Sequence, residues 1–495
     1  MRLIPLTALS LVMSITPAGA AEAPDYALTV YSAAAPGTLS TERLADYGDR
    51  LPGYAVVSDR RTLELSRGTG ELRFSDVASR IDPTTVSFAS LTDPSGTRVL
   101  EQNYQYDLVS QQKLLQRYLG EQLSVEQVRG DTIERTEGRL LSADGGLILS
   151  RADGSVVSLS NWSSVQFPAL PGGLISKPTL VWTLDAARGG AHQTQVSYQT
   201  QGMTWWTDYN LTLREDSGRC RMDLAAWVSL VNQSGGSFPN ARLKLVAGDV
   251  NRAPAAPAQP KYLQRAMVAE STMDAGFAES ELFEYHLYTL GRRTDLPDNS
   301  VKQLELFPSI TGADCRRELV FTASPMYQPW GQAMTDQGFG ATQSGEAGAF
   351  LEFSNTEANR LGLPLPGGRV RVSQAAADGA LEFIGEDLIK HTARGETLRL
   401  KLGTAFDISG ERRQVDFSYD EKARTITETI EVEVRNGKQR PQEVTLREYL
   451  YRWSGWRISG NSQTFDKRDA QTVDFALKVP AEGKSTVRYT VTYSW

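Results

Sequence analysis

Apolar and polar residues alternate with a period of two along much of this 495-residue chain, and the alternation continues to its last residue. Segments such as RCRMDLAAWVSLVN, TITETIEVEVRN and STVRYTVTYSW put apolar side chains on one face of an extended strand and polar side chains on the other. A helix would instead repeat its apolar residues three or four positions apart. The pattern therefore predicts an all-β protein.

Turn residues divide the alternation into short strands and indicate how the strands are grouped. The stretch 62–76 reads as two strands around a Gly-Thr-Gly turn, and 138–160 as three strands separated by Asp-Gly turns. The whole chain is too long for one hydrophobic core. We expect tandem β-sandwich domains: an N-terminal β domain over 25–101, a small β-barrel-like domain over 124–171, and a C-terminal β-sandwich region over 177–495.

One segment has a helical period, and two segments have no period at all. Over 104–123, most clearly from Tyr106 to Leu123, leucines recur on one helical face, which predicts one connecting α-helix. The stretch 251–280 is rich in Ala and Pro, and 327–348 is rich in Gly and Gln. We expect both stretches to be loops inserted in the sandwich region.

The first twenty residues, MRLIPLTALSLVMSITPAGA, have the organisation of a secretory signal peptide. Arg2 precedes a short apolar run, and the small residues Ala18, Gly19 and Ala20 follow as a cleavage site. A signal peptide over 1–20 predicts an exported protein, which we place in the periplasm. No later stretch is apolar for long enough to be a transmembrane helix. The formal net charge of −7 argues against nucleic acid as a partner.

The two cysteines, Cys220 and Cys315, both lie in strand-like segments. In an oxidising compartment they would form a disulfide if the fold brings them together, and two unpaired thiols fit the sequence equally well. The three histidines have no metal-ligand spacing, and their polar neighbours favour solvated surface positions; they are His192, His286 and His391. We therefore expect no metal site and no cofactor.

Two tryptophans stand side by side in YQTQGMTWWTDYNLTL, residues 198–213. In a strand, Trp205 shares a face with Tyr209 and apolar residues, whereas Trp206 shares the other face with Asp208. We expect Trp205 to be buried. Trp206 either packs against another domain or contacts a ligand. The same two interpretations apply to the tryptophans that flank a Ser-Gly turn further along, so the candidate binding residues are Trp206, Trp453 and Trp456.

Three motifs resemble the bacterial envelope family called "domain of unknown function 4139". GMTWWTDYNL is similar to the family's Gly-x-x-Trp-x-x-x-Tyr strand, NQSGG to its Asn-x-x-Gly turn, and NTEANRLGLPLPGG to its Asn followed by Leu-Pro-Leu-Pro-Gly-Gly. The resemblance is strongest from Lys177 to Trp495 and implies tandem β-sandwiches and an exported protein, but no activity. We interpret the motif residues as fold determinants, because asparagines and glycines suit turns; they are Gly202, Trp205, Tyr209, Asn232, Gly235, Asn355 and residues 363–368.

The sequence contains no convincing catalytic motif. Paired carboxylates could serve glycoside hydrolysis, but no spacing selects a pair from Glu281, Glu284, Glu386 and Asp387. The alternating strand that ends the chain is also typical of outer-membrane β-barrels. We predict a non-enzymatic binding or scaffolding module of the cell envelope, with a protein or glycan partner. The alternative is an envelope glycan- or peptide-processing hydrolase, and the third hypothesis is an outer-membrane β-barrel.

Overall fold

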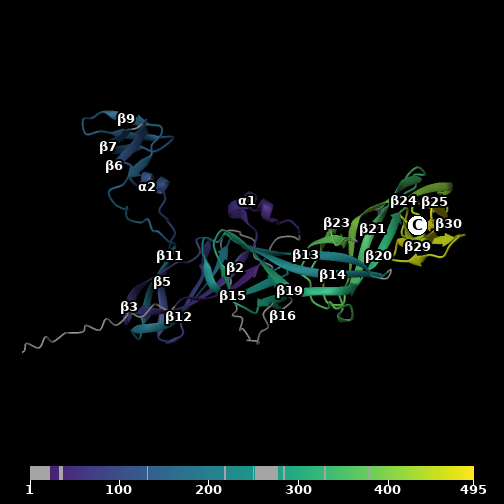
Figure 1. Cartoon of the computed structure of the whole chain (residues 1–495), viewed down its shortest axis with the longest axis horizontal. Coiled ribbons are helices and arrows are strands. Elements are labelled where there is room, and N and C mark those ends of the chain that lie inside the picture. The colour runs from purple at the N-terminus through teal and green to yellow at the C-terminus, as the bar shows by residue number, and fades with distance from the viewer. Residues whose placement is uncertain are drawn as a thin grey trace, which may run out of the picture.

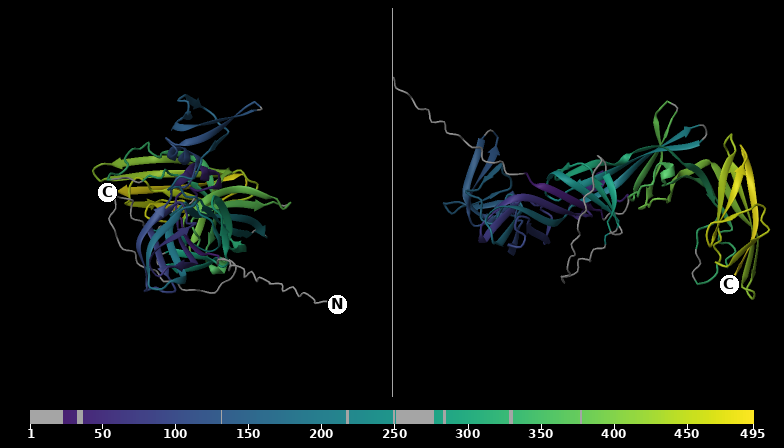
Figure 2. Two further views of the ribbon diagram at one scale, coloured as in Figure 1. Left: turned by 90° about the vertical axis from the view of Figure 1, so that its left-hand side faces the viewer. Right: turned by 90° about the horizontal axis from the view of Figure 1, so that it is seen from below.

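The computed structural model describes residues 23–32, 37–130, 132–216, 219–248, 250, 277–282, 285–327, 331–376 and 378–495. Strands dominate these residues and form five sheets, which confirms the predicted all-β class. The molecule is elongated, with the N-terminal strands towards one end, a middle sheet at its centre and a C-terminal sheet at the other end (Figure 1). The view from below keeps this order (Figure 2).

Eight strands form the N-terminal sheet in the order β16-β17-β15-β1-β2-β12-β4, with β18 paired to β15. Their bounds are β1 Asp25–Tyr31, β2 Tyr54–Leu65, β4 Ile81–Ser90, β12 Gly190–Gln201, β15 Phe238–Ala247, β16 Phe277–Leu282, β17 Tyr285–Leu290 and β18 Thr294–Leu296. A separate three-stranded sheet has the order β3-β11-β5, with bounds β3 Gly68–Ser75, β11 Thr179–Ala186 and β5 Thr97–Gln105.

The residues 25–101 do not form the separate N-terminal domain that we predicted. β12 pairs with β2 from Gly190, opposite Leu65, to Gln201, opposite Tyr54. β11 lies between β3 and β5, and β15 runs parallel to β1. Strands from both sides of the predicted boundary therefore share sheets and one hydrophobic core. Local alternation finds strands, but it carries no information about which distant strands pair.

A small domain, built from 111–167, projects from the N-terminal end of the molecule (Figure 1). The chain enters and leaves it side by side, because the N–H of Val109 donates to the Ile175 carbonyl and the N–H of Ile175 donates to the Asp107 carbonyl. Five strands form its sheet in the order β10-β6-β7-β8-β9. Their bounds are β6 Gln122–Arg129, β7 Thr132–Ser142, β8 Leu147–Ser150, β9 Val156–Leu159 and β10 Ser164–Gln166.

Two predictions for this region need correction. The helix expected over 104–123 is only α2, Gln111–Arg117; Ser110 caps its start, and Gly120 adopts φ +85° three residues beyond its end. β5 ends at Gln105 and β6 begins at Gln122, and the leucines that share the period lie in a loop (Leu108), in α2 (Leu115) and in β6 (Leu123). The domain expected to be barrel-like is a sheet whose edge strands β9 and β10 do not pair with each other.

The middle sheet has five strands in the order β19-β14-β13-β22-β23. Their bounds are β13 Met203–Asp216, β14 Arg219–Asn232, β19 Ser300–Asp314, β22 Gly368–Ala375 and β23 Leu381–Ile389. One face carries the apolar residues of the alternation, including Trp205, which is 2% exposed, and it packs into the same core as the N-terminal sheet. The prediction that Trp205 is buried is confirmed.

The C-terminal sheet has nine strands in the order β27-β30-β25-β24-β21-β20-β26-β29-β28. Their bounds are β20 Arg316–Thr322, β21 Thr342–Ser354, β24 Thr397–Asp420, β25 Thr425–Asn436, β26 Gln442–Tyr449, β27 Trp456–Ser459, β28 Asp466–Lys467, β29 Thr472–Val479 and β30 Gly483–Ser494. The long strands β21 and β24 belong to two cores. Phe353 and Leu398 pack with the middle sheet, whereas Ala347 and Ile408 pack in the C-terminal core.

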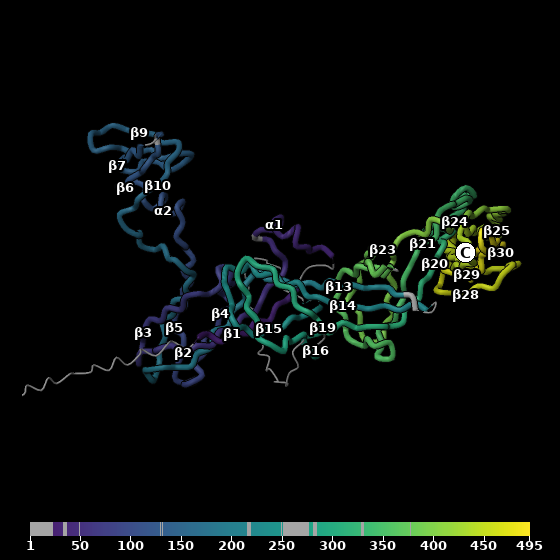
Figure 3. The backbone as a smooth tube through the Cα atoms, viewed as in Figure 1, coloured from purple at the N-terminus to yellow at the C-terminus, as the bar shows by residue number. Residues whose placement is uncertain are grey.

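The middle and C-terminal sheets are therefore joined by the strands β21 and β24, which pack in both cores, and by a disulfide. Figure 3 follows the chain along β20, β21 and β24 into the C-terminal end. Cys220, near the start of β14, is bonded to Cys315, the residue between β19 and β20. The bond links the hairpin of β13 and β14 to the point where the chain passes from the middle sheet to the C-terminal sheet.

The two predicted loop insertions are shorter than expected where the structure describes them. Of the stretch 251–280, residues 251–276 lie outside the described residues and 277–280 belong to β16. Of the stretch 327–348, residues 342–348 belong to β21. Among the described residues, no helix is both long and apolar enough to cross a membrane.

Residues that carried the family resemblance hold the turns of the fold, as we interpreted them. The Asn232 side chain donates to the carbonyls of Gly236, Leu296 and Pro297, at 2.9 to 3.1 Å. The Asn355 side chain donates to the carbonyls of Leu363 and Ala393, and the hydroxyl of Tyr209 donates to the Pro366 carbonyl. These are structural contacts between distant turns.

Candidate functional site

The outward face of the middle sheet collects polar side chains from four neighbouring strands. On β13 these are Trp206, Asp208 and Asn210, because alternate residues of a strand share a face. The pairing places Asp208 between Trp227 of β14 and Arg369 of β22, and it places Asn210 opposite Arg371. In the next row, Trp206 lies opposite Ser229, which lies opposite Gln303 of β19.

A short segment, residues 37–51, covers one end of this face, and we call it the cap. It contains the 3-10 turns η1 (Thr41–Arg43) and η2 (Gly48–Arg50) on either side of the helix α1 (Leu44–Tyr47). Three cap leucines form a small apolar cluster with Val231 of β14, and Tyr47 and Trp206 pack against it; the leucines are Leu39, Leu44 and Leu51. The cap therefore buries part of Trp206 and adds a wall to the sheet face.

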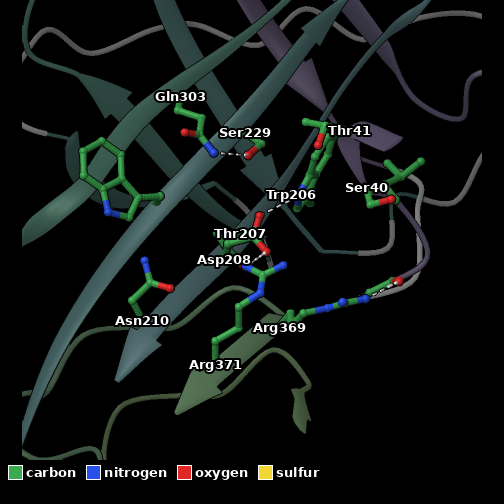
Figure 4. Close-up of a pocket in the computed structure, with 13 residues that line it drawn as sticks. Ser40, Thr41, Trp206, Thr207, Asp208, Asn210, Ser229, Gln303, Arg369 and Arg371 are labelled. Atoms are coloured by element: carbon green, nitrogen blue, oxygen red, sulfur yellow. Dashed lines mark hydrogen bonds and ion pairs between the residues drawn. The ribbon is translucent and has the colours of Figure 1, made fainter. Parts of the chain in front are cut away.

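The charged groups of the face are held in a chain of ion pairs. One oxygen of Asp208 accepts the indole N–H of Trp206 at 2.8 Å, and the other lies 3.1 Å from a guanidinium nitrogen of Arg371. Figure 4 shows Asp208 between these two side chains. Glu386 of β23 pairs with Arg369 at 3.2 Å and with Arg371 at 3.7 Å. Each carboxylate thus already has an arginine partner.

These elements enclose a cavity of about 340 Å³, which we call the cradle. Aromatic, amide, hydroxyl and charged groups all line it; they belong to Gly37, Leu39, Ser40, Thr41, Trp206, Thr207, Asp208, Asn210, Trp227, Ser229, Gln303, Arg369 and Arg371. The Trp227 side chain is 37% exposed and lines this cavity. A cavity of this size with a few convergent polar groups is typical of a small-ligand site.

The three predicted binding tryptophans are not brought together. Trp206 lines the cradle, whereas Trp453 and Trp456 rest against the C-terminal core. The indole N–H of Trp456 donates to the Ala470 carbonyl at 2.7 Å, and the Lys467 ammonium lies 4.9 Å from its ring centre. Both features are those of a side chain that packs on its own domain.

Among the described residues, the carboxylates considered for hydrolysis do not lie as a pair facing one cavity. Glu386 faces the cradle arginines, whereas its neighbour Asp387 accepts the backbone N–H groups of Leu388 and Lys401. The side chains of Glu281 and Glu284 lie outside the described residues. No cluster of three or more metal-ligating side chains occurs in the part of the chain that the structure describes.

One histidine prediction was wrong. His192 is buried, 2% exposed, and its Nδ1 lies 2.8 Å from the Ser90 hydroxyl oxygen. It lies on the face of β12 that packs inwards, whereas its polar neighbour Gln193 lies on the opposite, exposed face.

Sequence reasoning missed most of the cradle. Trp227 was within reach, because the alternation in RCRMDLAAWVSLVN puts it on the polar face with Asp223 and Ser229. Arg369 and Arg371 lie about 160 positions after Asp208, and only the parallel pairing of β13 with β22 brings them together. No local signal predicts that pairing.

The family described as "Domain of unknown function (DUF4139)" matches residues 194–495, which is more than half of the chain. This match confirms the resemblance that the motifs indicated, and it includes every strand of the middle and C-terminal sheets. The cap precedes the matched region, so the cradle combines residues from inside and outside it. No curated protein matches the sequence.

Proposed function

The chain belongs to the DUF4139 family, and we propose that it is an exported, non-enzymatic binding module of the cell envelope whose ligand site is the cradle. The cradle carries this proposal, because it places two tryptophans, amides and paired charges around one cavity on the polar face of a sheet. Binding groups on regular strands are held more rigidly than groups on loops, which favours recognition.

The disulfide between Cys220 and Cys315 supports the export part of the proposal. Disulfides persist in oxidising compartments such as the periplasm and are rare in the cytosol. The signal-peptide pattern over 1–20 points to the same compartment. Both features support the proposal that the protein works in the periplasm.

The contacts of the acids favour binding over hydrolysis. A glycoside hydrolase needs two carboxyl groups that flank the scissile bond, one of them available as an acid. In the cradle, Arg371 contacts both Asp208 and Glu386, so both carboxylates face an arginine instead of an open gap. This arrangement orients polar groups and suits a static site.

Site-specific crosslinking in living cells tests the proposal. A photo-crosslinking amino acid replaces Asn210, an exposed residue that lines the cradle, and the matched control replaces Glu443, an exposed residue of β26. We expect an adduct to envelope material at position 210 that is absent at position 443. Equal labelling at both positions, or only intramolecular adducts at 210, would refute a ligand site in the cradle.

A further inference from the structure

We infer that the cradle binds a neutral saccharide and that Trp227, instead of Trp206, is the ring on which a sugar stacks. This inference rests on the proposed function and identifies the class of its ligand. Three observations lead to it: the state of the two indole rings, the pairing of the charges around the cavity, and the kinds of polar group that line it.

The two tryptophans differ in how much of each ring is already in use. Trp206 packs against the apolar cluster of the cap, and its N–H donates to Asp208. It is fixed by the protein itself and forms part of the wall. Trp227 stands 37% exposed on the neighbouring strand, opposite Asp208, and belongs to none of the buried cores of the described residues. An indole that is held by a strand and open to solvent can stack on the apolar face of a sugar ring.

The charges at the cradle are paired within the protein. Two arginines and one aspartate line the cavity, Arg369, Arg371 and Asp208, and Glu386 beside it pairs with both arginines. A strongly charged ligand would have to compete with these internal pairs. A neutral ligand meets no such competition.

The remaining polar groups match a ligand that is rich in hydroxyl groups. Amides and hydroxyls both donate and accept hydrogen bonds, as sugar hydroxyls do. The cavity presents the amides of Asn210 and Gln303 and the hydroxyls of Ser40, Thr41 and Ser229. Gln303 and Ser229 already contact each other at 3.4 Å, so they form a prearranged polar edge beside the Trp227 strand. An extended peptide would instead seek unpaired backbone groups at a sheet edge, and β13 and β14 are interior strands.

The test is a binding titration of the purified full-length chain by calorimetry with neutral trisaccharides. The probes are chitotriose, maltotriose and cellotriose, with trigalacturonic acid as the anionic comparison and a capped tripeptide as the peptide comparison. We expect at least one neutral trisaccharide to bind. Trp227→Ala should weaken that binding by about tenfold or more, and Trp227→Tyr should restore most of it, because stacking needs an aromatic ring. Trp456→Ala, a matched loss of an indole far from the cradle, should leave the affinity unchanged.

Each of the other possible results contradicts one part of the inference or of the proposed function. If only the anionic sugar or the peptide binds, the neutral-saccharide inference fails. If a neutral sugar binds equally well to the wild type and to Trp227→Ala, Trp227 is not the platform. If no probe binds while crosslinking at position 210 captures an envelope protein, the inference fails and the proposed function stands. If position 210 captures nothing above position 443, the proposed function itself fails, and release of shorter sugars would reassign the site as a hydrolase.

Discussion

Two clusters in this molecule use the same kinds of side chain, two arginines and two carboxylates beside aromatic rings, and they use them differently. In the cradle cluster the four charged side chains remain between 16% and 43% exposed; they are Asp208, Arg369, Arg371 and Glu386. In the C-terminal core the four charged side chains are at most 1% exposed; they are Arg412, Glu428, Glu448 and Arg452, which we call the interior cluster.

The interior cluster directs its hydrogen bonds to the chain itself. Arg452 donates to Glu428 at 2.9 Å and to the carbonyls of Met334 and Asp336, and Arg412 donates to the Gly340 carbonyl. These contacts hold the loop before β21 against the C-terminal sheet. The cradle leaves its amides and one indole facing a cavity instead. The comparison teaches that buried arginine–carboxylate pairs here fix the fold, whereas half-exposed ones on a sheet face shape a site.

The largest expected effect comes from breaking the interior cluster. Arg452→Met should lower the free energy of unfolding of the C-terminal sheet by about 3 to 5 kcal/mol, because it leaves the buried Glu428 side chain without its arginine partner. Denaturant unfolding, with amide hydrogen exchange of β25 and β26 to locate the change, measures this. A loss below about 1 kcal/mol would place the interior cluster in the same energetic class as a surface pair.

The next largest effect concerns the disulfide, which joins the middle sheet, where the cradle lies, to the start of the C-terminal sheet. The bond closes a segment of 95 residues, and Cys220→Ser with Cys315→Ser should reduce stability by about 2 to 4 kcal/mol. We expect faster amide exchange at the joined ends of β14 and β19, with the interior of β25 unchanged. Treating the wild type with a reductant should reproduce the result and should not affect the double variant. Uniform loss of protection across both regions would contradict a local role.

The sequence predicted the features that depend on residues close together in the chain, such as the direction of a side chain on a strand. It missed the features that depend on which distant strands pair. Alternation alone assigned Trp205 to the core and Trp206 to the polar face, because side-chain direction in a strand follows from position. It could not show that the cap would cover Trp206, or that β22 would bring two arginines beside Asp208. The helix over 104–123 failed for a related reason, since leucines from a strand, a helix and a loop happened to share one period.

The two regions should also differ in the direction of their pH dependence. Burial raises the pKa of Glu448 above its ordinary 4.5, and Arg412 opposes that rise. The folded chain then holds the proton more tightly than the unfolded chain, so stability falls as pH rises from 4.5 towards the raised pKa.

Glu433, whose side chain is 15% exposed, provides the opposite case, because Lys484 and Arg435 lower its pKa from the same ordinary value. Its contribution is present above pH 4.5 and is lost as pH falls through the lowered pKa. Relative to the wild type, Glu448→Gln should remove a loss of stability as pH rises above 4.5. Glu433→Gln should remove a loss of stability as pH falls below 4.5. Unfolding midpoints across this pH range check both, and slopes of the same sign would show that burial does not dominate at Glu448.

The smallest effect on stability is expected in the cradle. This prediction best distinguishes a ligand site from a network of side chains that only stabilises the fold. Arg371 is 43% exposed, and surface pairs contribute about 1 kcal/mol at most, so Arg371→Met should barely change the unfolding midpoint. It should nevertheless weaken saccharide binding, because Asp208 then loses the group that orients it. Arg371→Lys should restore the positive charge but not the planar guanidinium group, so it should restore only part of the affinity. Calorimetric titration beside denaturant unfolding measures both quantities. In the interior cluster we expect the opposite, a large loss of stability when an arginine is replaced. An Arg371→Met variant that loses stability but binds saccharide normally would therefore show that the cradle only stabilises the fold.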